Sequence, residues 1–272
     1  MRTLWKGAIS FGLVNVPIGL YTATEKKEIK FNYLHDKCKT PIKYEKHCPT
    51  CDIEVPPEEI VRGYEFQKGQ YVVLKDEDFE RLPDGTSKTI DIIDFVDINE
   101  IDPVYFEKSY YLEPSRGGEK AYALLKRAMT ETGKIAVAKV TIRSKESLAV
   151  LRVYQNVLMM ETIFYPDEIR STAGLSGVQT EPSLHENEIK MANSLIANLS
   201  SHFDPTKYTN NYREDLMKII ETKISGGEVA QVQERETGKI IDLMEALRAS
   251  IAATEKQEQV KETKKRSRAK TG

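Results

Sequence analysis

Four side chains that bind soft metals lie close together near the start of the chain. They form two pairs, His35-x2-Cys38 and Cys48-x2-Cys51. Two such pairs supply the nitrogen and sulfur ligands of a tetrahedral structural zinc, and Pro49 favours a tight turn in the second pair. His47 is an alternative fourth ligand, and three reduced thiols beside a surface histidine are the alternative to any metal site. Because all four positions of this zinc would be filled by protein, we expect it to be structural.

The sequence carries no motif of the common catalytic or nucleotide-binding sites. There is no GxxxxGK[ST], GxSxG or HExxH, and neither His185 nor His202 has a nucleophile at a recognisable spacing. Scattered carboxylates could bind Mg²⁺, but the acidic stretch alternates with apolar residues as a half-exposed strand does. We therefore expect no enzymatic activity and no catalytic cofactor, and a metal-dependent nuclease is only the third hypothesis.

The net charge of −2 conceals blocks of opposite sign. Residues 26–46 hold seven lysines against three acidic residues, whereas residues 52–107 hold five basic against sixteen acidic residues. Residues 108–152 are again basic, with ten against four, and the last twelve residues hold six against one. A polyanion is a possible ligand if folding gathers the basic blocks on one surface; solvated charged faces are the alternative.

Composition also bears on where the protein acts. Three cysteines confined to residues 38–51 are too few and too clustered for the disulfide framework of a secreted protein. The chain shows no apolar run of transmembrane length and no signal peptide at its N-terminus. We expect a cytoplasmic protein.

Most of the chain up to residue 170 reads as β-strands. Runs rich in β-branched and aromatic residues recur with turn residues between them, which favours a barrel or a sandwich. Residues 5–23 read as one long bent strand, whose inward face switches near Leu13 at a bulge or sharp coil. One amphipathic helix is expected at 121–129, with Gly133 as its C-terminal cap.

Beyond the Gly/Ser-rich link at 171–180 the pattern becomes helical. Amphipathic helices are expected at 189–203 and 216–224, and a third at 239–253 carries an apolar stripe past a polar linker. That stripe needs a surface to cover it, either a partner or its own domain. The tail after it is highly charged and nearly free of apolar residues, which is typical of disorder.

Four blocks of the sequence closely resemble bacterial Ku proteins, in order and over nearly the whole chain. They are WKGAISFGLVNVPIGLYTA at 5–23, HDKCKTPIKYEKHCPTCDIEV at 35–55, RGYEFQKGQYVVL at 62–74 and RSKESLAVLRVYQNVLMMETIFYPDEIR at 143–170. The resemblance implies a mixed β and α fold: a β-barrel core over 1–170, with a DNA-encircling arch at about 24–63. It also implies a dimer-embracing helical arm over 171–227, followed by a helix and a short basic tail over 228–272.

The implied function is that of a homodimeric ring, associated with the nucleoid, that encircles double-stranded DNA ends. Such a ring protects and bridges the ends and recruits the ATP-dependent DNA ligase D for non-homologous end joining, the repair of double-strand breaks. A zinc-containing regulator that binds duplex DNA internally is the alternative function. Ends of any sequence must be accepted, so we expect lysine and arginine contacts to phosphate without readout of bases.

The residues expected at these sites follow from the basic blocks and the apolar stripe. DNA-binding candidates are Lys26, Lys27, Lys30, Lys37, Lys39, Lys43 and Lys46 in the arch, Arg62 after it, Lys108, Arg116, Lys126, Arg127, Lys139 and Arg143 on the barrel, and Lys264, Lys265 and Arg266 in the tail. The tail is short compared with the long lysine-rich extensions of some relatives. Partner-binding candidates, for the ligase, are Leu243, Leu247 and Ile251.

Overall fold

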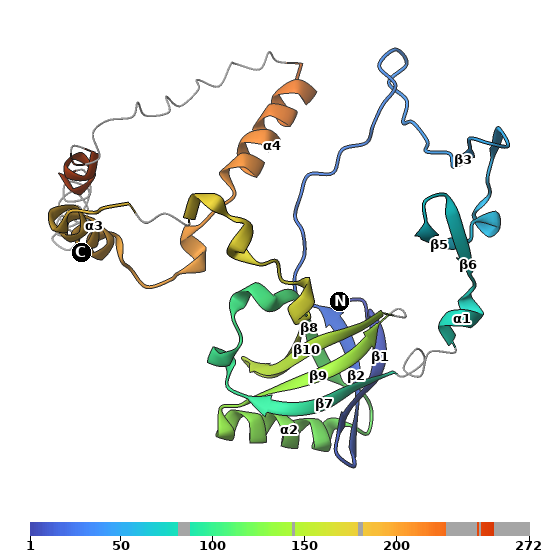
Figure 1. Cartoon of the computed structure of the whole chain (residues 1–272), viewed down its shortest axis with the longest axis horizontal. Coiled ribbons are helices and arrows are strands. Elements are labelled where there is room, and N and C mark those ends of the chain that lie inside the picture. The colour runs from blue at the N-terminus through green and yellow to red at the C-terminus, as the bar shows by residue number, and fades with distance from the viewer. Residues whose placement is uncertain (81–87, 143–144, 179–181, 227–243, 245, 253–272) are drawn as a thin grey trace. The chain divides into compact units, whose positions relative to one another are not determined.

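Seven strands close into a barrel (Figure 1). The structure is a computed structural model, and it describes residues 1–80, 88–142, 145–178, 182–226, 244 and 246–252. Around the barrel the strand order is β1-β2-β8-β11-β10-β9-β7. The strands are β1 Trp5–Phe11, β2 Val14–Thr22, β7 Thr89–Val96, β8 Phe106–Pro114, β9 Ile135–Ile142, β10 Lys145–Tyr154 and β11 Val157–Ile163. Runs rich in β-branched and aromatic residues, with turn residues between them, predicted β7 to β11.

The opening segment is a hairpin of two strands, so the prediction of one long bent strand is wrong. Strands β1 and β2 pair antiparallel with Phe11 opposite Val14, and Gly12 and Leu13 form the turn between them. Gly12 takes a φ of +59°, the backbone conformation that glycine supplies at the first position of such a turn. The switch of inward face near Leu13 therefore marks a reversal of the chain.

Strand β1 closes the barrel by pairing with β7 on its other side. The pairing is parallel, with Ala8 opposite Thr89, and the Ala8 N–H also donates to the Lys88 carbonyl at 2.9 Å. A Cβ at Gly7 would overlap that carbonyl and the Trp5 ring, so only glycine fits at this crossing.

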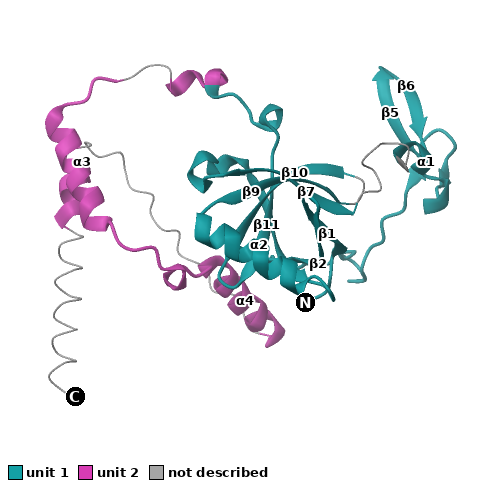
Figure 2. Cartoon of the chain, turned by 90° about the horizontal axis from the view of Figure 1, so that it is seen from below, with its two compact units in different colours: residues 1–172 teal, residues 173–272 magenta. Residues whose placement is uncertain are grey.

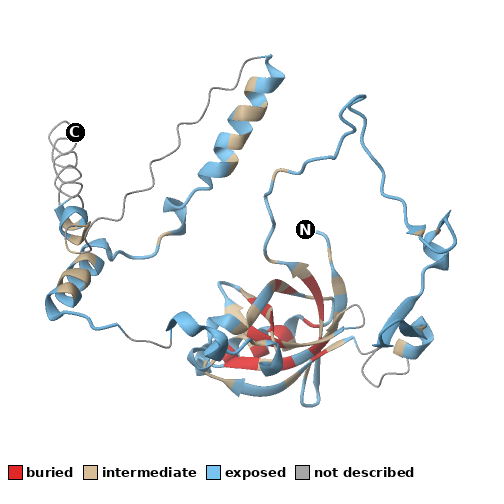
Figure 3. Cartoon of the chain, turned by 45° about the horizontal axis from the view of Figure 1, so that its top comes forward, coloured by how far each residue is buried: buried red, intermediate tan, exposed pale blue. Residues whose placement is uncertain are grey.

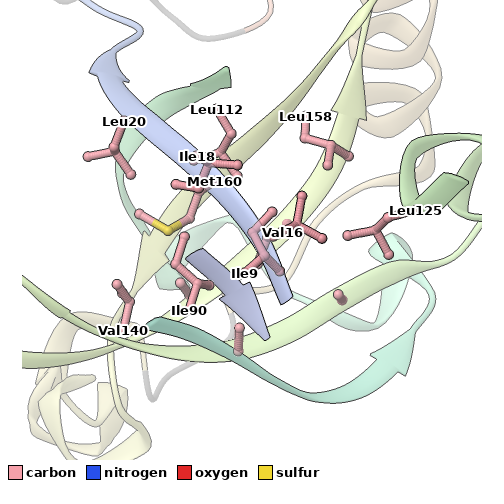
Figure 4. Packing of buried hydrophobic residues seen from close by; sticks show 14 of the residues in the cluster. Ile9, Val16, Ile18, Leu20, Ile90, Leu112, Leu125, Val140, Leu158 and Met160 are labelled. Atoms are coloured by element: carbon pink, nitrogen blue, oxygen red, sulfur yellow. The ribbon is translucent and has the colours of Figure 1, made fainter. Parts of the chain in front are cut away.

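The barrel encloses one main hydrophobic core, as Figure 4 shows. Ile9, Ile18, Leu20, Leu112 and Met160 are fully buried there and come from four different strands. A smaller cluster of Ile135, Val150 and Ile163 lies on the outer face of the barrel wall, where residues 96–106 cover it. The buried residues supply the hydrophobic free energy that holds the barrel, at roughly 25 cal/mol per Å².

Helix α2, Glu119–Thr132, packs its inner face on the barrel core and ends at Gly133, which takes a φ of +65°. The expected helix and its glycine cap are thus confirmed. Tyr122 reaches from this helix between β8 and β11. Its hydroxyl donates to the Leu112 carbonyl at 2.7 Å and accepts from the Leu158 N–H at 2.7 Å, so it satisfies two buried backbone groups of the barrel wall.

Residues 23–88 leave the barrel between β2 and β7, a longer excursion than the 24–63 expected for the arch. The described elements in it are short. They are β3 His47–Cys48, β4 Ile53–Glu54, the 3₁₀ turn η1 Pro57–Glu59, β5 Arg62–Gln67, β6 Gln70–Leu74 and α1 Asp76–Glu80. No described residue from 23 to 79 is buried, in contrast to the barrel (Figure 3). Residues 23–79 therefore form no hydrophobic core of their own.

The chain divides into two units, residues 1–172 and 173–272 (Figure 2). In the second unit, α3 spans Glu186–Leu199 and α4 spans Asn211–Ile224, close to the expected helices, and Asn210 caps α4 by accepting from the Arg213 N–H at 2.9 Å. Neither helix buries a single residue. Of the helix expected at 239–253, residues 246–252 are helical, and the tail 253–272 lies outside the described residues.

Short 3₁₀ turns complete the described structure. They are η2 Ile98–Glu100, η3 Pro103–Tyr105, η4 Pro166–Glu168, η5 Thr172–Gly174, η6 Ser176–Val178 and η7 Pro205–Lys207.

Candidate nucleic-acid interface and metal-ligand pairs

Within the excursion 23–88, the seven lysines of residues 26–46 are exposed. They are Lys26, Lys27, Lys30, Lys37, Lys39, Lys43 and Lys46. Lys39 forms an ion pair with Asp36, three residues earlier. Within the part of the chain that the structure describes, Lys26, Lys30, Lys43 and Lys46 have no ion pair. Their ammonium groups are therefore available to an external anion without first giving up a carboxylate partner.

The basic candidates on the barrel differ, because neighbouring groups already hold most of them. Lys108 pairs with Glu107 at 2.8 Å, Arg127 with Glu131 at 2.7 Å and Lys139 with Glu146 at 3.1 Å. The Lys126 ammonium donates to the Asn156 carbonyl at 2.9 Å. Arg116 is the one described barrel candidate without a hydrogen bond or ion pair. Phosphate binding by the paired residues would compete with these contacts.

These pairs also shift the pKa values of their carboxylates. A hydrogen bond from Lys108 lowers the pKa of Glu107, and one from Lys139 lowers the pKa of Glu146. The hydroxyl of Tyr165 donates a hydrogen bond to Glu146 at 3.0 Å. Burial of the Tyr165 phenol, together with this hydrogen bond, raises the pKa of Tyr165 to about 12.

Arg62 lies at the start of β5 and is exposed. Its guanidinium approaches Asp76 at 3.7 Å and stands over the Phe79 ring, 5.0 Å from the centroid. These contacts tie β5 to α1, which gives Arg62 a structural role within the excursion. Four other DNA-binding candidates, Arg143, Lys264, Lys265 and Arg266, lie outside the described residues.

The first metal-ligand pair is formed in a small loop. His35 Nδ1 and Cys38 Sγ lie 3.0 Å apart, and the Thr40 hydroxyl is 2.8 Å from the same sulfur. Hydrogen bonds with Thr40, and then with His35, lower the pKa of Cys38 to about 7. In a tetrahedral zinc site, a nitrogen and a sulfur ligand stand about 3.5 Å apart, so this pair is close to the spacing that one metal ion requires.

The second pair lies at the turn between β3 and β4. Hydrogen bonds from the backbone of Cys51 and Thr50 lower the pKa of Cys48, whereas the hydrogen bond with Cys48 raises the pKa of Cys51. Cys51 is exposed and Cys48 is half-buried. His47, the alternative ligand, pairs instead with Asp52, with 3.2 Å between Nε2 and Oδ1.

The structure does not bring the two pairs together. Among the described residues, no three histidine, cysteine, aspartate or glutamate side chains lie close enough to hold one metal ion. The donor chemistry suits zinc, but a single chain in this arrangement presents two separate pairs of ligands. Whether zinc binds stays a prediction.

A hollow on the barrel was not foreseen from the sequence. Its volume is about 780 Å³, and Tyr21, Tyr111, Tyr122 and Tyr154 line it together with residues 155–157. Tyr111 and Tyr154 stack with their ring centroids 6.3 Å apart. These tyrosines come from three strands and a helix, and no short-range sequence pattern marks residues that meet only when a barrel closes.

The described part of the C-terminal apolar stripe includes Leu247 and Ile251, both half-buried, whereas Leu243 lies outside it. No helix in the described ranges is both long and apolar enough to span a lipid bilayer.

Comparison with known proteins accounts for this fold. Residues 10–191 match the family model described as the Ku70/Ku80 beta-barrel domain, which covers more than half of the chain. The chain belongs to the Ku family. Both the resemblance noted in the sequence and the expected mixed fold with a Ku β-barrel are thereby confirmed.

Several curated Ku relatives align along almost all of this chain, and each is named non-homologous end joining protein Ku. The protein of Symbiobacterium thermophilum is 52% identical over 259 residues, covering 94% of this chain and 64% of the relative. Those of Desulfitobacterium hafniense and Bacillus subtilis are each 48% identical, covering 95% and 93% of this chain and 90% and 83% of the relatives. The chain thus spans somewhat less than two thirds of the Symbiobacterium Ku protein.

Proposed function

We propose that this protein binds double-stranded DNA ends without sequence preference, as a homodimeric ring, in non-homologous end joining. Membership of the Ku family carries the proposal, because the aligned relatives are named non-homologous end joining proteins. The ring protects and bridges the ends and recruits ligase D, and the protein itself catalyses nothing. It acts in the cytoplasm, at the nucleoid.

The excursion 23–88 supports the ring. It leaves and re-enters the barrel wall and buries none of its described residues from 23 to 79, which suits a segment whose packing partner is another molecule. If fully extended at ~3.3 Å per residue, each half of it could reach on the order of 100 Å, so even a partly folded arch has ample length to pass around a duplex.

Exposed lysines support contacts to phosphate. Lys26, Lys30, Lys43 and Lys46 form no ion pair within the described residues, whereas the barrel candidates are mostly paired. Binding that depends on many ammonium–phosphate contacts releases counterions and carries no sequence information. We therefore assign the main DNA contacts to the excursion and a smaller contribution to the barrel.

The second unit supports the homodimer. Its helices α3 and α4 bury nothing, and Ile189, Ile196, Met217 and Ile224 are between 42% and 79% exposed. Exposed apolar stripes of this length are normally covered by a partner. A second copy of the chain is a partner that is always present at equal concentration. In the dimer, each subunit would cover the helical arm of the other.

The apolar stripe of residues 246–252 is the proposed contact with ligase D. Leu247 and Ile251 stand one helical turn apart on it. Structural zinc is a further part of the proposal, with His35, Cys38, Cys48 and Cys51 as ligands and about one atom per chain by elemental analysis. A fully folded, metal-free protein would exclude it.

Topology of the DNA provides the decisive test. A ring threads onto DNA from an end, so gel-shift and crosslinking should show capture of a linear duplex and almost none of a closed circle of identical sequence. The alternative, a zinc-containing regulator that binds internally, predicts equal binding to both. Equal binding would therefore reject the ring.

The same samples can be assayed for nuclease activity. Cleavage that requires Mg²⁺, and that is abolished on replacing one carboxylate of the acidic stretch, would contradict the non-enzymatic assignment.

A further inference from the structure

The hollow on the barrel is lined by four aromatic rings. Tyr122 is buried, and Tyr21 and Tyr111 are half-buried. Tyr154 stacks on Tyr111 and is 37% exposed. The volume of about 780 Å³ falls within the roughly 300–1,000 Å³ of sites that hold small ligands. The hollow therefore offers flat apolar surface on which another planar ring can stack.

Neighbouring side chains hold these rings in place. The Tyr21 hydroxyl accepts from the Thr3 hydroxyl at 3.2 Å. The Arg152 guanidinium stands over the Tyr154 ring, 5.4 Å from its centroid. Arg152 is in turn fixed by an ion pair with Glu161 at 2.7 Å, and both side chains are largely buried. Little side-chain freedom is therefore lost when a ligand stacks on the rings, which favours binding.

Two side-chain amides also line the hollow, at the turn between β10 and β11. Gln155 and Asn156 form this turn, and Gln155 takes a φ of +52°, which is uncommon for a residue other than glycine. Within the described ranges, neither side-chain amide has a hydrogen-bond partner. An amide carries donors and an acceptor, so it can form hydrogen bonds with the edges of unpaired bases.

The charges around the hollow suit a nucleotide better than a free anion. Among the described residues that line it, only Glu113 has a charged side chain, which repels phosphate but accepts from the amino group of a base. The Lys126 ammonium donates to the Asn156 carbonyl at 2.9 Å. Arg116 is exposed and follows Pro114, a lining residue, by two positions. Phosphates can thus lie at these two cations while a base enters the hollow.

The hollow lies where the excursion 23–88 begins. Tyr21 comes two residues before Ala23, the first residue of the excursion. The Ala23 N–H donates to the Ser109 carbonyl at 3.0 Å, which holds Ala23 beside β8, the strand that carries Tyr111. An unpaired strand at the end of a duplex that the excursion holds is therefore kept at a high local concentration near the hollow.

We propose that the hollow binds unpaired nucleotides at the end of a DNA molecule, with their bases stacked on the tyrosines and their phosphates at Arg116 and Lys126. This inference rests on the proposed binding of DNA ends. Because every base has a flat face, the site accepts single strands of any sequence. The protein thereby distinguishes overhanging or frayed ends from blunt ones, although it reads no sequence.

Affinity for matched DNA ends tests the proposal. A duplex with a single-stranded overhang and the same duplex with blunt ends are titrated at one salt concentration. The overhang should raise the affinity on the order of tenfold, the effect of stacking a base on an aromatic side chain. Equal affinity of the wild-type protein for both ends, the result expected if the hollow docks a protein segment instead, would overturn the proposal.

Tyr111→Leu combined with Tyr154→Leu should abolish most of this difference, because leucine keeps apolar packing but offers no ring for stacking. Phe95→Leu is the matched control, since it removes a 41% exposed ring that does not line the hollow, and it should preserve the preference for overhangs. Circular dichroism checks that each variant is folded. A preference that survives in the double tyrosine variant would exclude the hollow as the site.

Photocrosslinking gives a second readout on the wild-type protein. An overhang that contains 5-iododeoxyuridine should crosslink to Tyr21, Tyr111 or Tyr154, as identified by mass spectrometry of the digested complex. Crosslinks confined to other residues would reject the hollow while leaving the proposed function intact. Failure of the wild-type protein to bind any linear duplex would reject the proposed function, and the site with it.

Discussion

Tyr122 acts in the barrel wall through its hydroxyl as well as its ring. The hydroxyl bridges the Leu112 carbonyl and the Leu158 N–H, and burial raises the pKa of the phenol. The Tyr122 ring packs in the main core, so this residue couples α2 to β8 and β11. A buried polar group that satisfies two others is costly to remove, because both of its partners are then left unpaired.

Tyr122→Phe should therefore destabilise the barrel by about 1–3 kcal/mol, since each partner is deprived of its hydrogen bond without water to replace it. The melting temperature, followed by circular dichroism, should fall by several degrees. Tyr154→Phe is the matched control, because Tyr154 is 37% exposed. Equal melting temperatures for the two variants would contradict this role for the Tyr122 hydroxyl.

From the sequence, contacts at a site could be predicted only between residues that lie close together in the chain. His35 and Cys38 meet because they stand three residues apart, and the glycine cap of α2 follows from its helical period. Whether Lys139 is free depends on Glu146, which β10 places beside it across the sheet. Cross-strand partners of this kind are set by register, which a single sequence does not reveal.

Strands and helices with a strong sequence pattern could be predicted, but the turns at which the chain reverses direction could not. Gly12 is one of three glycines in an apolar run without the Asn-Gly or Asp-Gly signal of a tight turn, so the first hairpin resembled a single strand. Strands β9, β10 and β11 are rich in β-branched and other apolar residues and lie where expected. The end of the excursion depends on β1 pairing with β7, a contact between segments far apart in the chain.

Helix α4 is the element on which the proposed dimer depends most directly. Met217→Glu combined with Ile224→Glu places charge on its exposed apolar stripe. Because burial of each such side chain is worth about 1.5–3 kcal/mol, dimer affinity should fall on the order of 100-fold or more. Analytical ultracentrifugation measures the affinity.

Glu221→Gln, an exposed polar substitution on the same helix, is the control for this experiment. The melting transition of the barrel should be unchanged in both variants, because α4 lies in the other unit. A double variant that dimerises like wild type would contradict the assignment of α4 to the dimer.

For the whole molecule, a net charge near zero is compatible with the proposed binding of a polyanion, because the charges are segregated along the chain. The acidic stretch, residues 52–107, is densest on α1, and the exposed lysines of residues 26–46 precede it. Affinity should therefore depend on local ammonium–phosphate contacts and fall steeply with salt in spite of the overall acidity.

Lys43→Ala should lower the slope of log affinity against log salt by about 0.9 for each phosphate that is no longer neutralised, and hence by nearly 2 for a dimer. Lys139→Ala should change the slope less, because Lys139 is already paired with Glu146. Equilibrium titrations of a linear duplex at several salt concentrations measure both slopes. Equal changes would place the barrel lysines in the interface as fully as those of the excursion.

The whole excursion is inserted between β2 and β7, so its length affects the stability of the barrel only weakly. The barrel closes when β1 meets β7, so residues 23–88 enter the stability of the barrel only as a loop whose ends must be joined. Closure entropy grows with the logarithm of loop length, and doubling this loop would cost only ~0.6 kcal/mol. Insertions and deletions can therefore lengthen or shorten the excursion, and with it the opening of the proposed ring, while the barrel stays folded.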